Sequence, residues 1–225
     1  GIRLKTGETL PAEVTVSNAD PGFTYGQLLR NHRKRRWTDA RLARSRWSMG
    51  LFVWYFGTKG TRQMWLDAGH HTILVGPRYR EHIRDLFRAG RITEDMSLYI
   101  HRPTVTDPSA APPGDDTFYA LSPVPHLGHD AADWSTFADT YKHRVAKMLE
   151  PLIPGFRRHI TAERIVTPET FRDRYHSPFG AGFSLEPRIL QSAWFRPHNI
   201  SEELQGLYLC GAGTHPGAGV PGVIG

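Results

Sequence analysis

The chain has 225 residues with 28 basic and 22 acidic side chains, a formal net charge of +6, and 39% hydrophobic residues. This composition is typical of a globular protein and excludes a disordered tail, a coiled coil and a collagen-like repeat. The single cysteine, Cys210, excludes a disulfide framework, and no apolar run approaches the roughly 18–20 residues that a membrane span requires.

In the first half of the chain, short strands are followed by a strongly basic segment. Residues 2–20 predict a β-hairpin and a strand, and the turn formers of Asn18–Gly22 mark a domain boundary. Residues 23–46 are helical in character and contain the basic run Arg33–Arg36. Ser48–Phe56 is apolar and aromatic at consecutive positions, which indicates a strand covered on both faces. A short strand and a short helix follow at residues 71–75 and 79–88.

The second half contains the clearest helix signal. Between residues 134 and 152, apolar side chains recur every three or four positions, which predicts an amphipathic helix that Pro151 and Pro154 end. Strands are predicted at residues 97–101, 117–122, 159–166 and 207–210, and a further helix at residues 168–174. Mixed strands and helices favour an α/β or α+β architecture.

The stretch after the last predicted strand is the most informative part of the sequence. Glycine stands at positions 211, 213, 217, 219, 222 and 225, directly after Leu207–Cys210. Glycine accepts positive φ angles and lets a ligand approach the backbone, and a strand, a glycine-rich turn and a helix together hold phosphate groups in α/β sheets. Because a turn needs only one or two glycines, this spacing favours a nucleotide or phosphate site over a surface turn.

Leu207–Gly225 resembles, almost letter for letter, the C-terminal signature of the bacterial-type phytoene desaturases, the FAD-dependent carotenoid desaturases. Other segments resemble the same family and follow in the family's order, so the resemblance covers essentially the whole chain. These segments are Val16–Asp20, Leu51–Gly57, Gly76–Arg80, His101–Pro108, Pro123–Gly128 and Gln191–Asn199. Each segment is short, and their common order makes the match specific.

The resemblance implies an α/β fold, as a fragment of a two-domain flavoprotein. A Rossmann-like FAD domain, incomplete here, would be interrupted by a mixed-sheet α+β substrate domain. Residues 1–20 would end the first FAD segment, residues 21–172 would form the substrate and membrane-facing domain, and residues 173–225 would return to the FAD domain. The chain lacks an initial methionine and stops in the glycine-rich stretch, so we expect a piece of a longer protein that is inactive alone.

The activity that the resemblance implies is FAD-dependent desaturation of phytoene in carotenoid biosynthesis, with successive double bonds formed towards neurosporene or lycopene. Desaturation of an unactivated C–C bond removes a hydride and a proton, and a redox cofactor must take the electrons. A quinone or oxygen would then reoxidise the flavin. The resemblance assigns FAD contacts to Gly211, Gly213, Thr214, His215, Gly217, Gly219, Val220 and Gly222. Related flavin amine oxidases usually carry an acidic residue where Ala212 stands, so no contact is transferred to that position.

A long hydrocarbon substrate requires an apolar tunnel. The aromatic candidates for its lining are Phe52, Trp54, Phe56, Trp194 and Phe195. Ordinary sheet core is an equally good interpretation for half of the apolar residues on a strand, because alternate side chains face opposite sides. No catalytic residue is assigned. His101, Asp107 and His126 have the chemistry for proton removal, and capping of turns beside proline is the favoured interpretation of each.

The basic segment Arg30–Arg46 allows three interpretations. It is a solvated helix face, a surface that docks on anionic lipid near a substrate that lives in the bilayer, or a nucleic-acid site in which Trp37 and Trp47 stack on bases. No nucleic-acid-binding motif accompanies it. We therefore favour peripheral docking on the cytoplasmic side of a bacterial membrane and expect no nucleic-acid partner.

Two alternative functions stay open at this stage. One is a related enzyme of the same fold, such as a hydroxyneurosporene- or methoxyneurosporene-type desaturase or a carotenoid isomerase, and the other is a basic nucleic-acid-binding module. A metal site is not predicted, because His70, His71 and His82 lack the spacing of zinc ligands. Cys210 is expected to be an inert core thiol.

Overall fold

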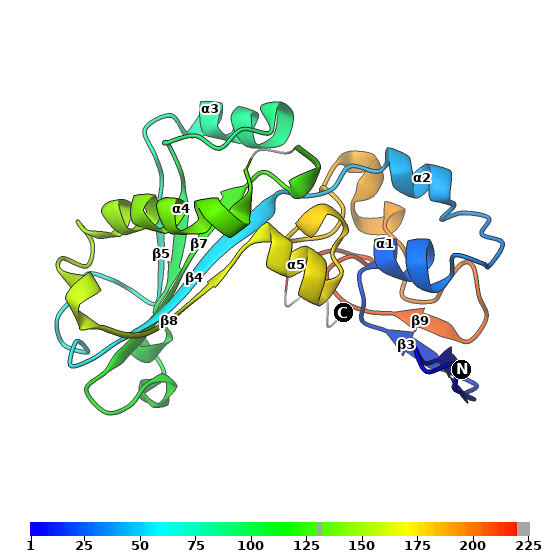
Figure 1. Ribbon diagram of the computed structural model, residues 1–225, viewed down its shortest axis with the longest axis horizontal. Coiled ribbons are helices and arrows are strands. Elements are labelled where there is room, and N and C mark those ends of the chain that lie inside the picture. The colour runs from blue at the N-terminus through cyan, green and yellow to red at the C-terminus, as the bar shows by residue number, and fades with distance from the viewer. Residues whose placement is uncertain (130–131, 220–225) are drawn as a thin grey trace. The chain divides into compact units, whose positions relative to one another are not determined.

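Residues 1–129 and 132–219 are described by the computed structural model of the chain, shown in Figure 1. The chain leaves one structural unit after Ser48 and returns to it at Phe171, so Met49–Thr170 forms a second unit of its own. Residues 21–48, which the resemblance assigned to the substrate domain, thus share a unit with residues 1–20. The assignment of the units to flavin and to substrate stays a prediction.

The unit Met49–Thr170 is built on a five-stranded antiparallel sheet with the strand order β5-β6-β7-β4-β8. Its strands are β4 (Gly50–Thr58), β5 (His71–Leu74), β6 (Leu98–His101), β7 (Asp116–Val124) and β8 (Ile160–Val166). The sequence predicted a strand at each of these places, and all five are confirmed to within two residues at their ends. The predicted helix over residues 79–88 is α3 (Tyr79–Arg84), continued by one wider turn over Asp85–Ala89.

Helix α4 (Trp134–Leu149) covers one face of this sheet (Figure 1). Asp133 caps its first turn by accepting a hydrogen bond from the Ser135 amide at 3.0 Å. The predicted apolar stripe is confirmed, because Tyr141, Val145 and Leu149 recur on the face that is buried in the core. This stripe and the sheet together enclose the larger of the two hydrophobic cores.

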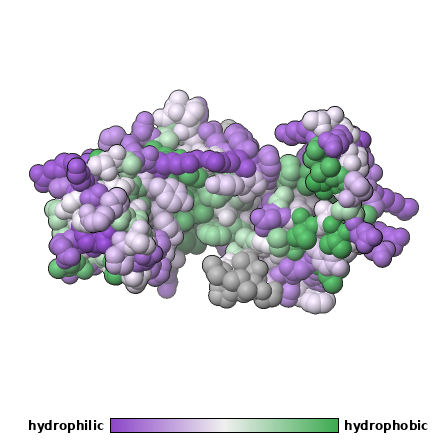
Figure 2. All heavy atoms as spheres, turned by 90° about the horizontal axis from the view of Figure 1, so that it is seen from below, coloured by the Kyte–Doolittle hydropathy of each residue, from purple (hydrophilic) through white to green (hydrophobic). Residues whose placement is uncertain are grey.

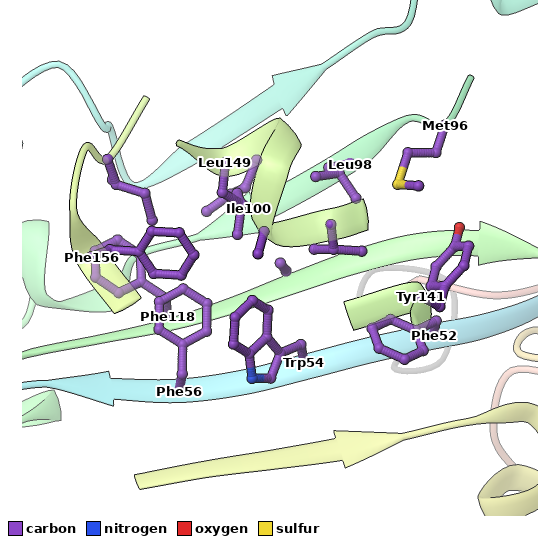
Figure 3. Packing of buried hydrophobic residues seen from close by; sticks show 14 of the residues in the cluster. Phe52, Trp54, Phe56, Met96, Leu98, Ile100, Phe118, Tyr141, Leu149 and Phe156 are labelled. Atoms are coloured by element: carbon purple, nitrogen blue, oxygen red, sulfur yellow. The ribbon is translucent and has the colours of Figure 1, made fainter. Parts of the chain in front are cut away.

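Strand β4 supplies three aromatic side chains to that core, as Figure 3 shows. The ring of Phe52 lies 4.9 Å from that of Tyr141, Trp54 lies 5.7 Å from Phe156, and all three β4 aromatics are at most 2% exposed. The prediction of a strand covered on both faces holds for most of β4, and Tyr55, with 45% exposure, is the exception. Phe52, Trp54 and Phe56 thus fill the core.

The other unit, residues 1–48 and 171–219, contains two small sheets among its described residues. Strands β1 (Ile2–Arg3) and β2 (Thr9–Leu10) form the predicted hairpin, and β3 (Thr15–Ser17) pairs in parallel with β9 (Leu207–Leu209). Its helices are α1 (Pro21–Phe23), α2 (Asp39–Arg44) and the later part of α5 (Pro168–Tyr175), which begins in the other unit. A small core gathers Tyr25, Trp37, Trp47, Ala181, Leu185 and Leu209.

The basic segment is less helical than its composition suggested. Helical structure covers α1 with a wider turn up to Leu28, and then only α2. Between them, the backbone amides of Arg35, Arg36 and Trp37 donate hydrogen bonds to the Glu203 carboxylate at 2.6, 2.7 and 2.5 Å. These three amides point together at a side chain from a distant segment, so they are not available to a helix.

No helix in the described part of the chain is long and apolar enough to cross a bilayer.

Candidate functional site: the glycine-rich loop

The parallel pair of β3 and β9 positions the glycine-rich loop. Thr15, Val16 and Ser17 lie opposite Leu207, Tyr208 and Leu209, so the carboxyl ends of both strands lie at the same edge. Beyond the strands, the Cys210 amide donates a hydrogen bond to the Ser17 carbonyl at 3.0 Å, which continues the pairing into the loop. Adjacent carboxyl ends of parallel strands are where α/β sheets bind dinucleotides.

The backbone of the loop is turned by glycines with positive φ angles. Gly211, Gly217 and Gly219 have φ values of 111°, 143° and 115°, which residues with a side chain rarely adopt. Thr214 closes the first turn, because its amide and its hydroxyl both donate hydrogen bonds to the Gly211 carbonyl, at 3.1 and 2.8 Å. The hydroxyl of Thr214 is therefore already used within the loop.

Gly213 has a different reason to be glycine. Its φ angle is ordinary, but a Cβ atom there would lie 2.3 Å from Cδ of Pro21 and 2.6 Å from Oγ of Ser184. Close packing against the start of α1 thus requires a hydrogen atom at this position. By contrast, a Cβ atom at Gly219 would meet no described atom within 4 Å.

Arg196 holds the loop in place through hydrogen bonds to backbone carbonyls. Its guanidinium group is 3% exposed and donates hydrogen bonds to the Ala212 carbonyl at 2.7 Å and to the Leu185 carbonyl at 2.8 Å. Burial lowers the pKa of Arg196, and the charge of Asp20 partly offsets this effect. For Asp20, burial raises the pKa, and its hydrogen bonds and the charge of Arg196 counteract the rise.

His215 is the loop residue that carries a buried ring nitrogen without a described partner. Its backbone amide donates to the Pro197 carbonyl at 2.8 Å. Its ring lies 6.0 Å from the rings of both Trp194 and His198, and its buried Nδ1 atom has no hydrogen-bond partner among the residues that the structure describes. A buried polar nitrogen without a partner is rare. Together with the glycine backbone of the loop, this nitrogen fits the polar groups of a bound dinucleotide such as FAD.

The described residues do not include every position that sequence reasoning proposed as a ligand or substrate contact. Val220 and Gly222 are outside the described residues. Trp194 and Phe195 are 64% and 42% exposed, in the same unit as the loop. Cys210, expected in a core, is only partly buried and accepts a contact from Asn18 Nδ2 at 3.5 Å.

The candidates for proton removal have local partners. Asp107 accepts hydrogen bonds from the Ser109 amide and hydroxyl, which lower its pKa, and so caps a turn. His126 accepts from the Gly128 amide at 3.1 Å. Turn capping was the favoured interpretation of both. His101 behaves differently, because it lies against His70 and His71.

Two residues of the loop site escaped sequence reasoning. Arg196 lies within Gln191–Asn199, a segment singled out only as part of the resemblance, and Asn18 lies in the turn after β3. Their contacts to residues 212 and 210 span 16 and 192 positions. Neither contact has a local sequence signal, because each joins segments that only the fold brings together.

Comparisons with known proteins bear on the fold and on the family of the chain. No protein-family model matches the chain. A solved structure, an oxidoreductase from Methanosarcina mazei, has the same fold, with a TM-score of 0.54 and 17% identity over 95% of this chain and 41% of its own.

Curated relatives match the whole chain at far higher identity. The phytoene desaturases (neurosporene-forming) of Rhodobacter capsulatus and Cereibacter sphaeroides are 69% and 64% identical to it, and the phytoene desaturase (lycopene-forming) of a Paracoccus species is 46% identical. The chain spans 43–44% of the length of these three relatives. With its whole length matched at such identity, the chain belongs to the bacterial phytoene desaturase family.

Proposed function

We propose that the complete protein is an FAD-dependent phytoene desaturase of bacterial carotenoid biosynthesis, which introduces successive double bonds into phytoene. The observation that carries the proposal is the identity of 69% and 64% to two neurosporene-forming relatives, against 46% for a lycopene-forming one. We therefore expect neurosporene as the main product. Identity falls to 36% for the all-trans-zeta-carotene desaturase of Myxococcus xanthus, which favours phytoene as the substrate over later carotenes.

The glycine-rich loop is the part of this chain that we propose for holding FAD. Gly211, Gly217 and Gly219 keep the backbone free of side chains in conformations that glycine favours, and His215 offers the Nδ1 atom to a polar group of the ligand. When bound, FAD supplies the oxidant that accepts two electrons from the substrate. A quinone or oxygen would then take these electrons from the enzyme.

The structure changes the order of preference among the proposed tunnel residues. Phe52, Trp54 and Phe56 are packed against α4 and the other strands, so a hydrocarbon could contact them only if the core opened. Trp194 and Phe195 carry large exposed apolar surfaces, and the Trp194 ring faces His215. We propose these two residues as the substrate contacts nearest to the flavin.

We also propose that the unit with the glycine-rich loop docks on an anionic membrane surface. Ile189 and Leu190 are 86% and 70% exposed. Leu190 and Phe195 line one groove together with Arg41 and Arg44 of α2, and Figure 2 shows hydrophobic groups among hydrophilic ones at the surface. Apolar groups beside basic ones suit an interface with anionic lipid, from which a bilayer-dissolved substrate would enter.

The nucleic-acid alternative loses its support in this structure. Trp37 and Trp47, the rings proposed to stack on bases, are 1% and 8% exposed. Trp37 instead stacks with Tyr25 at 6.1 Å and lies under the guanidinium group of Arg41 at 3.9 Å. Neither ring is therefore presented to a nucleic acid.

Expression of the full-length protein in a phytoene-producing bacterium tests the proposal. We expect the purified protein to show flavin absorption and the cells to accumulate neurosporene. A flavin-containing protein that leaves phytoene unchanged but converts another carotenoid would identify a sister enzyme. A protein without flavin would refute the proposal as a whole.

A further inference from the structure

Three histidines gather at one end of the sheet in the unit Met49–Thr170. His71 opens β5 and His101 closes β6, and the two face each other in the antiparallel register. His70 directly precedes β5. One ring nitrogen from each of the three lies within 4.8 Å of those of the other two. Strand pairing thus joins a His-His pair to a histidine 30 residues later in the chain.

Hydrogen bonds orient two of the three rings through the same atom. The Nδ1 atom of His70 lies 2.7 Å from the Thr106 hydroxyl, and the Nδ1 atom of His71 lies 2.6 Å from the Tyr99 hydroxyl. In both rings this leaves Nε2 as the nitrogen for a ligand. Fixing one imidazole nitrogen by an outer partner, with the other nitrogen on the ion, is the usual arrangement of histidines that bind a metal.

A buried ion pair holds the segments that carry these histidines. Arg102 and Asp116 form a salt bridge in which both side chains are almost fully buried. The Arg102 guanidinium also donates to the Ala68 carbonyl at 3.1 Å, two residues before His70, and the Arg102 amide donates to the His70 carbonyl at 2.9 Å. The loop before β5 and the end of β6 are therefore tied together, so the cluster is preorganised.

All three candidate ligands are imidazoles, whose neutral form binds metal ions. The set contains no carboxylate or thiolate. Neutral nitrogen ligands suit divalent ions such as Zn²⁺, Cu²⁺, Ni²⁺ and Co²⁺ rather than Mg²⁺ or Ca²⁺.

We propose that His70, His71 and His101 bind one divalent transition-metal ion, with Zn²⁺ as its representative. His71 is exposed, so the fourth position of a tetrahedral site is open to water or to a ligand from solution. The Nε2 atoms of His70 and His101 lie 2.7 Å apart, a separation at which they share a proton. Tetrahedral zinc at about 2.0–2.1 Å from each nitrogen holds two ligands roughly 3.3 Å apart, so binding displaces that proton and separates the rings by about half an ångström. This site does not depend on the proposed desaturase activity.

Metal binding by the tag-free full-length protein tests this site. After equilibrium dialysis against Zn²⁺ and removal of free metal, we expect one zinc per chain in the wild type and none in His101→Asn. His143→Asn is the matched control, because His143 is exposed on α4, and it should bind zinc like the wild type. Co²⁺ provides a second readout, since its visible absorption reports nitrogen ligands in tetrahedral geometry.

A milder variant separates loss of the site from loss of the fold. Thr106→Val removes the partner of His70 Nδ1, together with a long 3.4 Å hydrogen bond to the Pro103 carbonyl. It should weaken Zn²⁺ binding about 10–100-fold, with the melting temperature in the presence of chelator unchanged. Zinc retained equally by the wild type and by His101→Asn would overturn the proposal, and so would a wild type that retains none. An unaltered zinc affinity in Thr106→Val would show that His70 is not a ligand in the proposed orientation.

Discussion

The Nη1 atom of Arg196 lies 2.7 Å from the carbonyl oxygen of Ala212, so a buried cation holds the middle of the glycine-rich loop. The same guanidinium group reaches the Leu185 carbonyl with Nη2. A lysine could keep the charge but not both hydrogen bonds, because its ammonium group is a single point on a flexible stem.

We expect Arg196→Lys to weaken FAD binding by the full-length protein. Hydrogen bonds from a charged group contribute about 1.5–3 kcal/mol, so loss of one corresponds to roughly tenfold to a hundredfold in affinity. Titration of the apoprotein with FAD, followed by flavin fluorescence, measures the change. Arg188→Lys, at an exposed position, should bind like the wild type, and equal affinities of both variants would contradict the role of Arg196.

Gly213→Ala is expected to destabilise the unit that contains the loop by about 1–3 kcal/mol, as overpacking does elsewhere. The added methyl group would overlap Pro21 and Ser184. Gly26→Ala is the control, because its Cβ atom would meet only Leu42, at an ordinary 3.6 Å. Urea denaturation of both variants gives the comparison, and equal unfolding free energies would show that Pro21 yields to the new side chain.

Removing one partner of the buried ion pair Arg102–Asp116 should lower the free energy of unfolding much more than removing one partner of a surface ion pair. We expect Asp116→Asn to cost about 3–5 kcal/mol, because the Arg102 charge stays buried without its counter-ion. Glu81→Gln removes the exposed partner of Arg84 and should cost less than about 1 kcal/mol. Chemical denaturation followed by circular dichroism distinguishes these values, and similar losses in the two variants would refute the contrast.

The stability of the protein should fall in alkaline solution partly because of Tyr141. Burial raises the pKa of Tyr141 to about 12, and its hydroxyl lies 2.7 Å from the Ser122 hydroxyl. Since the folded state binds this proton more tightly than the unfolded chain, whose pKa is about 10, the contribution is complete below pH 10. It is lost as the pH rises from about 10 to 12.

Tyr141→Phe therefore should show a smaller loss of unfolding free energy between pH 10 and 12 than the wild type. At pH 7 the variant should be less stable by about 1 kcal/mol, because the Ser122 hydroxyl loses its buried partner. Tyr175→Phe, at an exposed position, should keep wild-type stability at pH 7. If the unfolding free energy of the wild type and of Tyr141→Phe fell equally between pH 10 and 12, Tyr141 would not contribute to the alkaline loss of stability.

Membrane docking should depend on both apolar and basic groups. We expect Ile189→Ser with Leu190→Ser to reduce flotation of the full-length protein with anionic liposomes at low and high salt. Arg44→Gln with Arg46→Gln should reduce it at low salt, where electrostatic attraction is least screened. Exposed arginines of the other unit provide the control variants, Arg80→Gln and Arg88→Gln. If flotation depended neither on the salt concentration nor on the anionic lipid content, the proposed electrostatic contribution to docking would be refuted.

The sequence by itself determined the elements with strong local signals. The apolar stripe of α4 and the alternation of the β-strands are repeated over a few turns or residues, so their places follow from the chain alone. The glycine-rich loop was also evident, because glycine spacing after a strand is a local pattern. Its resemblance to the phytoene desaturases is matched by the whole-length identity to curated relatives.

Only the tertiary structure decided which side chains meet. Strand register directed Phe52, Trp54 and Phe56 into the core and set His101 opposite His71. The fold of the later segment brought Arg196 into contact with the glycine-rich loop. Contacts of this kind join residues that are separated by up to 193 positions. They depend on pairing and packing between elements, and these long-range constraints leave no periodic trace in the local sequence.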